Sequence, residues 1–170
     1  PWYLTEDGSE DWDTFQEYVS LPQVLAIGES GLDKLSSVNM DIQEKAFLKQ
    51  AEIASSINKP LIIHCVKAYN EIIRYKMDIN PEVAWIIHGF RGKKELASQL
   101  LDHGFYLSFG EKYQEDALKA TPLDKLLIET DESEVGIYEL YKRASEYLEI
   151  ETNEFIKKVQ ENIQNIFLGS

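Results

Sequence analysis

Short apolar runs alternate with longer amphipathic stretches along this chain, and that rhythm limits its possible folds more than any other feature. Each run is nearly continuous and rich in branched residues, as expected of strands that are covered on both faces of a parallel sheet. The stretches between the runs predict helices, so the pattern is that of repeated β/α units. The predicted strands cover residues 24–27, 61–63, 83–87, 105–109 and 126–128.

Helical periodicity supports this interpretation. Ile42, Ala46 and Ile53 fall on one face of a helix that must end before Pro60. A second apolar stripe is followed by Gly104, a favourable residue directly after a helix end. The predicted helices cover 41–57, 68–77, 93–103, 137–148 and 155–166, the last with Thr152 or Asn153 as its N-cap.

Length and composition predict one domain over residues 1–170. Of the 170 residues, 44% are hydrophobic, which is enough for one sizeable core and argues against disorder. A complete eight-unit β/α barrel usually needs about 200 residues or more. No strand is predicted before Val24, so we expect an α/β, barrel-like fold whose first one or two strands are absent from this chain.

The single cysteine, Cys65, rules out an intrachain disulfide framework and suits a reducing compartment, so we expect a cytoplasmic protein. No stretch approaches the roughly 20 apolar residues of a membrane span. An acidic run follows the first four residues, so no signal peptide is expected. The net charge of −13 predicts weak non-specific binding to nucleic acid, but bound divalent metals can reverse the local sign and so permit a nuclease.

Glu29, His64, His88 and Asp131 each lie within three residues of the end of a predicted strand. In a parallel β/α fold the carboxyl ends of the strands share one face, and that face carries the active site. Imidazoles and carboxylates suit Zn²⁺, Mn²⁺ or Fe²⁺. The alternatives are structural: a histidine hydrogen-bonded in the core, Glu29 stabilising a loop, or Asp131 capping the segment after it. Four such residues at equivalent positions favour a metal site.

Five short motifs surround these residues, namely 28–33 (GESGLD), 60–68 (PLIIHCVKA), 88–92 (HGFRG), 104–110 (GFYLSFG) and 126–131 (LLIETD). In this order they resemble the motifs of the TatD-like metal-dependent DNases of the amidohydrolase-like superfamily. Residues 162–167 (NIQNIF) also fit that family. The resemblance therefore covers nearly the whole chain.

The resemblance implies a distorted TIM-like (β/α) barrel that holds one or two divalent metal ions, Zn, Mg or Mn. Carried over position by position, Glu29, His64, His88 and Asp131 become metal ligands. Glu29 would bridge two metals and Asp131 would also hold the attacking water, so these two are the expected catalytic residues. The implied reaction is hydrolysis of phosphodiester bonds in DNA by metal-activated water.

Two basic residues follow the histidines closely. Lys67 and Arg91 could contact a substrate phosphate, and a surface salt bridge is the alternative for each. Lys67 stands where the family commonly has arginine, so it offers a point charge instead of a bidentate fork. Glu132-Ser133 likewise stands where the family more often has A-P.

The family's H-x-H motif on the first strand is not found in this sequence, which opens with Pro1-Trp2-Tyr3, residues that resemble those following the family's second strand. Without H-x-H one metal position loses two ligands. We therefore expect an amino-terminally truncated chain, and a partner that supplies the missing part is the alternative.

Three functions remain in competition. The first is a metal-dependent DNase, whose partners would be DNA and a divalent metal, with no membrane and no identified protein partner. The second is a small-molecule amide or ester hydrolase on the same site, which the net charge of −13 favours. The third is a metal-free, non-catalytic remnant, for which the missing H-x-H is the main argument.

Overall fold

The structure is a computed structural model that describes residues 11–169. The opening residues Pro1-Trp2-Tyr3 and the expectation attached to them lie outside this range. The chain divides into two compact units, Pro1–Trp85 and Ile86–Ser170, and each is described by itself. The single domain expected over residues 1–170 stays a prediction.

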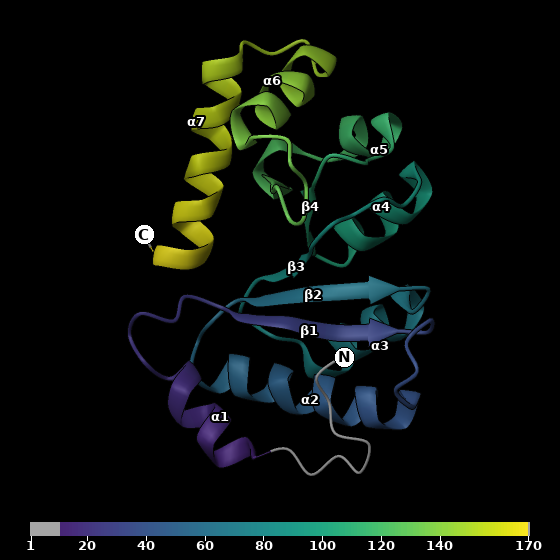
Figure 1. Cartoon of the computed structure of the whole chain (residues 1–170), viewed down its shortest axis with the longest axis vertical. Coiled ribbons are helices and arrows are strands. Elements are labelled where there is room, and N and C mark those ends of the chain that lie inside the picture. The colour runs from purple at the N-terminus through teal and green to yellow at the C-terminus, as the bar shows by residue number, and fades with distance from the viewer. Residues whose placement is uncertain (1–10, 170) are drawn as a thin grey trace. The chain divides into compact units, whose positions relative to one another are not determined.

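The first unit pairs two parallel strands with helices packed against them (Figure 1). Its elements, in chain order, are α1 (Trp12–Val19), β1 (Ile27–Asp33), α2 (Met40–Ser56), β2 (Leu61–Val66) and α3 (Tyr69–Ile79). Helix α2 packs against β1, and α3 packs against β2. In the core of this unit, the buried ring of Phe47 meets the ring of Trp85 edge-on at 5.4 Å between centroids.

Strand β1 lies further along the chain than the sequence predicted. The expected strand covered residues 24–27, whereas the observed strand is Ile27–Asp33. Glu29 therefore lies inside the strand and not after it, so this part of the prediction is wrong. His64 likewise lies inside β2, which extends to Val66.

Glycines explain why the apolar pattern missed β1. A Cβ atom on Gly31, whose φ is +150°, would lie 1.9 Å from the carbonyl oxygen of His64. A Cβ atom on Gly28 would lie 2.7 Å from the Cβ of Ile62. The close approach of β1 to β2 thus requires residues without side chains, and such residues carry no hydrophobic signal.

Helix α2 is joined to the end of β1 through a buried amide. The helix starts after Asn39, whose side chain accepts a hydrogen bond from the Asp41 N–H at 2.7 Å. One turn further on, the buried amide of Gln43 accepts from the Asp33 N–H at 2.7 Å and donates to the carbonyls of Asp33 and Val38 at 3.0 and 2.8 Å. These bonds satisfy backbone groups where the strand ends, and they fix the position of Asp33.

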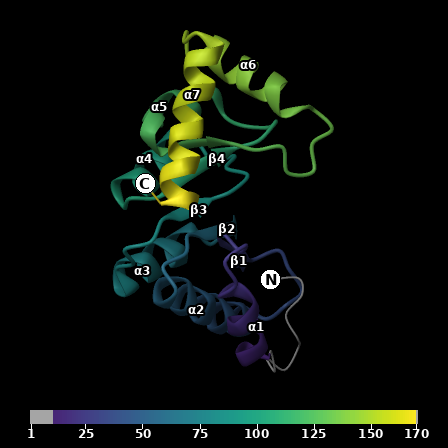
Figure 2. The same cartoon turned by 90° about the vertical axis from the view of Figure 1, so that its left-hand side faces the viewer.

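The second unit contains three parallel strands in the order β3-β4-β5. Strand β3 begins with Trp85, the last residue of the first unit. Helices α6 and α7 pack against each other and against β5, while α4 packs against α5 and β4 (Figure 2). The elements are β3 (Trp85–Ile87), α4 (Lys94–Asp102), β4 (Tyr106–Phe109), α5 (Glu115–Ala120), η1 (Leu123–Lys125), β5 (Leu126–Ile128), α6 (Ile137–Tyr147), α7 (Thr152–Ile163) and η2 (Gln164–Leu168).

The start of α7 differs from the prediction. The N-cap is Glu151, whose carboxylate accepts a hydrogen bond from the Glu154 N–H at 2.9 Å. Thr152 is already helical, and its hydroxyl lies 3.0 Å from the Ser145 hydroxyl, so it is engaged with α6. The expectation of Thr152 or Asn153 as the N-cap is therefore wrong.

The first asparagine of the last motif, Asn162, has a structural role. Asn162 is buried in α7, and its Nδ2 donates to the carbonyl oxygens of Leu123 and Leu126 at 2.6 and 2.9 Å. These bonds attach α7 to η1 and to the start of β5. Asn162 thereby supports the strand that leads to the expected site residue Asp131.

The remaining predicted elements are found within a few residues of their expected bounds. Helices α1 and α5 were not predicted, since they span only 8 and 6 residues and give little periodic signal. None of the helices in the described part of the chain combines the length and apolar character that a transmembrane span requires.

Candidate metal centre

In the first unit the imidazole of His64 lies between two carboxylates. Its Nδ1 is 3.9 Å from Oε2 of Glu29, and its Nε2 is 3.8 Å from Oδ2 of Asp33. The strand register explains this arrangement, because Gly31 pairs with His64 and the two acidic residues lie two positions to either side of it. The strand is irregular between Ile27 and Ser30, where Glu29 lies, and both carboxylates nevertheless lie next to the imidazole of His64.

The two carboxylates differ in exposure. The Glu29 side chain is 41% exposed, whereas that of Asp33 is 11% exposed. Asp33 is also held in place, since its Oδ1 accepts from the Leu35 N–H at 2.7 Å and its backbone is bonded to Gln43. A fixed carboxylate beside one ring nitrogen is the usual device that orients a metal-binding histidine, and the exposed Glu29 is the one accessible to a ligand.

Cys65 follows His64 directly but is buried in the core. Burial raises the pKa of its thiol to about 12. Among the described residues, Cys65 lies in none of the groups of side chains whose ligand atoms come together, so it does not belong to the candidate ligand set.

In the second unit, His88, Glu129 and Asp131 form a compact group. Each of these three side chains offers one ligand atom, and these atoms all lie within 4.8 Å of one another. The His88 Nδ1 is 3.4 Å from Oε1 of Glu129. His88 directly follows β3, and the two acidic residues follow β5, so the ends of two strands supply the group.

The loop after β3 is fixed by packing and backbone bonds. Gly89 has φ +56°, and its N–H donates to Oε1 of Glu129 at 2.7 Å. Phe90 is fully buried, its N–H donates to the carbonyl of Ser108 at 2.9 Å, and its ring meets Phe109 edge-on at 5.8 Å. The alternation of glycine and buried phenylalanine therefore holds His88 in place and sends Arg91 outward.

Asp131 is exposed and has φ +47°, a left-handed conformation that aspartate adopts more readily than most residues. A tight turn follows, in which the Ser133 N–H donates to the carbonyl of Thr130 at 2.8 Å. Unusual backbone conformations of this kind gather at functional sites, which agrees with the role expected of Asp131.

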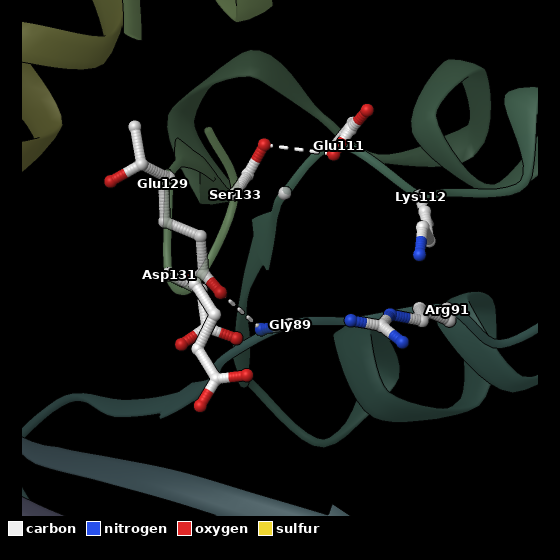
Figure 3. A pocket seen from close by; sticks show the side chains of 10 residues that line it. Gly89, Arg91, Glu111, Lys112, Glu129, Asp131 and Ser133 are labelled. Atoms are coloured by element: carbon white, nitrogen blue, oxygen red, sulfur yellow. Dashed lines mark hydrogen bonds between the residues drawn. The ribbon is translucent and has the colours of Figure 1, made fainter. Parts of the chain in front are cut away.

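A pocket of about 290 Å³ opens beside this group (Figure 3). Glu129 and Asp131 stand on one side of it, and Arg91 and Lys112 stand on the other. At the rim, the Ser133 hydroxyl donates to Oε2 of Glu111 at 2.8 Å, which joins the loop after β5 to the loop after β4. Glu111 and Glu132 line the pocket as well, so two carboxylates next to His88, Glu129 and Asp131, face two cations, Arg91 and Lys112, across it.

The donor set in the second unit fits a divalent metal ion. Ligand atoms bonded to one ion at about 2.0–2.2 Å must lie within roughly 4.4 Å of one another, and the atoms of this group lie within 4.8 Å of one another, so a small shift of the side chains suffices. One imidazole with two carboxylates suits Zn²⁺, Mn²⁺ or Mg²⁺, and neutralisation by a cation would offset the repulsion between the two acidic groups. In the first unit His64 and Glu29 offer the same donor types.

The structure thus brings Glu29 to His64 and His88 to Asp131, each pair within its own unit. Arg91 lines the pocket, whereas Lys67 lies exposed directly after β2 with φ +57°. Asp33, Glu129 and Lys112 were not predicted as site residues from the sequence. The first two stand inside the quoted GESGLD and LLIETD motifs, where a second acidic residue near the first was the available signal.

An α/β fold with histidines and carboxylates at or near its strand ends is the arrangement of metal-dependent hydrolases built on β/α barrels. A family model described as "TatD related DNase" matches residues 1–168 of the sequence. The chain belongs to this family, so the resemblance inferred from the motifs is confirmed.

Similar proteins support the same family assignment. Over 131 residues the chain is 36% identical to YabD of Bacillus subtilis (strain 168), described as an uncharacterized metal-dependent hydrolase; the match covers 72% of this chain and 51% of YabD. Over 128 residues it is 33% identical to the Escherichia coli (strain K12) protein described as the 3'-5' ssDNA/RNA exonuclease TatD, covering 68% of this chain and 48% of that protein. The chain spans about half the length of the curated relatives it matches.

Solved structures show the same fold. The crystal structure of YjjV, a TatD homolog from Escherichia coli K12, matches with a TM-score of 0.84 over 92% of this chain and 70% of that chain, at 18% identity. A TatD family hydrolase from Entamoeba histolytica matches with a TM-score of 0.83 over 97% of this chain and 71% of that chain, also at 18% identity. The expected fold class, α/β of the distorted TIM-like barrel type, is confirmed.

Proposed function

We propose that this protein is a deoxyribonuclease that uses divalent metal to hydrolyse phosphodiester bonds, with Glu29, His64, His88 and Asp131 as metal ligands. The observation that carries the proposal is the group of His88, Glu129 and Asp131 beside a pocket with a basic opposite wall. Membership of the TatD-related DNase family and the likeness to a protein described as an ssDNA/RNA exonuclease support it.

The chain's own residues divide the work of hydrolysis between them. One or two ions, Zn²⁺, Mg²⁺ or Mn²⁺, would supply a more acidic water and neutralise charge on the phosphoryl oxygens when bound. Asp131, exposed and next to His88, orients the attacking water and accepts its proton. Glu129, held by the Gly89 N–H, keeps His88 in position. Glu29, next to His64, would be a further metal ligand, as the family resemblance implies.

Two basic residues are proposed to bind substrate phosphate. Arg91 faces the acidic wall of the pocket, where its planar guanidinium can form two parallel bonds to one phosphate. Lys67 lies after β2 and offers a single flexible charge. DNA is therefore the proposed partner, and Cys65 as the single cysteine supports a proposed cytoplasmic location.

One property favours a second function. The net charge of −13 opposes the approach of a nucleic-acid backbone at long range. A small-molecule ester or amide hydrolase on the same site would not meet this obstacle. The two functions separate in an assay, because they require different substrates.

The test combines metal analysis with nuclease assays of the full chain. We expect one or two divalent ions per chain by elemental analysis after loading, and cleavage of end-labelled single-stranded DNA with Mg²⁺ or Mn²⁺ that chelation abolishes. Asp131→Ala should reduce cleavage by about 10²-fold or more. Glu134→Ala removes an exposed carboxylate three positions away that does not line the pocket, so it should retain activity.

A chain that binds no metal would exclude both enzymatic functions. A chain that binds metal and hydrolyses p-nitrophenyl acetate but leaves DNA intact would support the small-molecule hydrolase. Equal activity of the Asp131→Ala and Glu134→Ala variants would refute the role given to Asp131.

A further inference from the structure

Two cations on the basic wall of the pocket stand without an acidic partner. Within residues 11–169, neither Arg91 nor Lys112 forms an ion pair or a side-chain hydrogen bond, whereas Lys34, Arg143 and Lys158 each pair with a glutamate. Both unpaired groups line the pocket, and their charged ends lie on the same side of it in Figure 3. A cationic wall that faces a cavity is available to an anion that enters it.

The backbone at Lys112 is held by the contacts of its two neighbours in the chain, while its own side chain is exposed. On one side, Glu111 accepts a hydrogen bond from the Ser133 hydroxyl at 2.8 Å. On the other side, the half-buried ring of Tyr113 meets the ring of Phe109 edge-on at 6.0 Å. Lys112 therefore projects from a backbone segment that is anchored at both flanking residues.

Arg91 and Lys112 face Glu129 and Asp131 across the pocket and do not contact them. No ion pair within the described residues joins Arg91 or Lys112 to Glu129 or Asp131, so the pocket separates them. A ligand between the walls must present anionic oxygens to the cations. The other end of the ligand faces Glu129 and Asp131, and a cation or a water molecule must link it to their carboxylates.

The lining decides what part of a substrate the pocket can recognise. The ten lining residues, all inside the described range, include no aromatic side chain, so the pocket offers no platform on which a base could stack. Its volume of about 290 Å³ lies at the lower end of the range for small-molecule sites. Four carboxylates also line the pocket, those of Glu111, Glu129, Asp131 and Glu132, so an anionic group can be held only at its two cations, Arg91 and Lys112, and the volume admits a phosphate group there with its substituents.

We propose that Lys112, together with Arg91, binds the phosphate group of the substrate and makes this pocket a phosphate subsite that is indifferent to base sequence. This inference rests on the proposed function, because it names the part of a nucleic-acid substrate that the second unit recognises. Lys112 is thereby a specificity-determining residue that favours phosphate esters over neutral esters and amides. Its single ammonium group complements the bidentate fork of Arg91.

The test measures phosphate binding separately from catalysis. Inorganic phosphate is titrated into the metal-free full chain, and the amide resonances of residues 89–92 and 110–112 are followed by NMR. We expect saturable shifts at these residues, and about tenfold weaker phosphate binding in Lys112→Ala, the loss of one charge-assisted contact. Lys112→Arg should restore binding. Lys119→Ala, which removes an exposed lysine of α5 that does not line the pocket, should bind as the wild type does.

A second measurement uses bis(p-nitrophenyl) phosphate with Mg²⁺ and the same variants. Lys112→Ala should raise KM by about the same factor as the phosphate Kd while kcat changes less, since the contact is made in the ground state as well. Equal phosphate affinity in Lys112→Ala and Lys119→Ala, or no phosphate binding in the wild type, would overturn the subsite even if DNA is cleaved. If Lys112→Ala weakens phosphate binding but the chain cleaves no phosphodiester, the subsite is retained and the proposed function is rejected.

Discussion

The backbone N–H of Gly89 donates a 2.7 Å hydrogen bond to Oε1 of Glu129, forty positions further along the chain. The same carboxylate oxygen lies 3.4 Å from the Nδ1 of His88. One backbone donor and one imidazole thus determine where the Glu129 carboxylate stands, and this carboxylate links the loop after β3 to the end of β5. Glu129 contributes charge to the candidate metal group, whereas its contact with Gly89 needs only an acceptor oxygen.

Glu129→Gln separates these two roles. The amide oxygen can still accept from the Gly89 N–H, so the fold and the midpoint of thermal unfolding should change little. The lost charge should weaken Mn²⁺ binding by about 10–100-fold, the usual cost of altering a carboxylate in or next to a metal site. Isothermal titration with Mn²⁺ measures the affinity. Glu134→Gln serves as the charge-matched control, and equal Mn²⁺ affinities in the two variants would remove Glu129 from the site.

Gly31→Ala should be the most disruptive small substitution in the first unit. Its Cβ would lie 1.9 Å from the carbonyl oxygen of His64, and φ at this position is +150°, so β1 and β2 must move apart. We expect a loss of about 3 kcal/mol or more in the free energy of unfolding. Urea denaturation measures it. Gly136→Ala is the control, because no atom of the described residues other than those of its chain neighbours lies within 4 Å of the added Cβ, and φ there is −64°. Similar losses in both variants would contradict the steric argument.

The sequence predicted most of the architecture because parallel strands in this fold carry unbroken apolar runs. It placed His88 and Asp131 correctly after β3 and β5 for that reason. It misplaced β1, since a strand built around Gly28 and Gly31 has no apolar run to detect. Glu29 was still selected because it follows the predicted strand 24–27, although the observed strand runs past it, and its motif led to the same residue.

The supporting contacts of the site were beyond the reach of sequence patterns. Asp33 beside His64 and the bond from Gly89 to Glu129 depend on strand register and on loop conformation, which only the folded chain defines. Lys112 is another such case. It follows a strand by three positions in a polar loop, where a lysine looks like ordinary solvated surface until the pocket is seen.

Gln43→Leu should destabilise the first unit and disturb His64. The substitution keeps the approximate size of a fully buried side chain but leaves the N–H of Asp33 and two carbonyls without their bonds. Unsatisfied buried groups of this kind cost about 2–4 kcal/mol in total. Denaturant unfolding measures the loss, and the histidine resonances in NMR report whether Asp33 has moved from His64. Gln50→Leu, on the same helix at a half-buried position, should cost much less, and the opposite ranking would show that the Gln43 bonds contribute little.

Tyr141→Phe should make the protein more resistant to alkaline unfolding. Burial raises the pKa of Tyr141 above the ordinary value of 10.0, and its ring packs against Phe155 at 5.9 Å. In the unfolded chain the phenol ionises from about pH 10 upward, while the folded chain retains the proton, so the unfolded state is favoured as pH rises through this range. The contribution of the protonated Tyr141 to the free energy of unfolding is thus complete below pH 10 and is lost as the pH rises above it. Unfolding by urea at pH 7.5 and pH 10.5 measures the free energy of unfolding at each pH. Between these two values it should decrease less for Tyr141→Phe than for the wild type. Tyr138→Phe, an exposed tyrosine on the same helix, controls for loss of a hydroxyl, and an equal decrease in all three proteins would contradict the assignment.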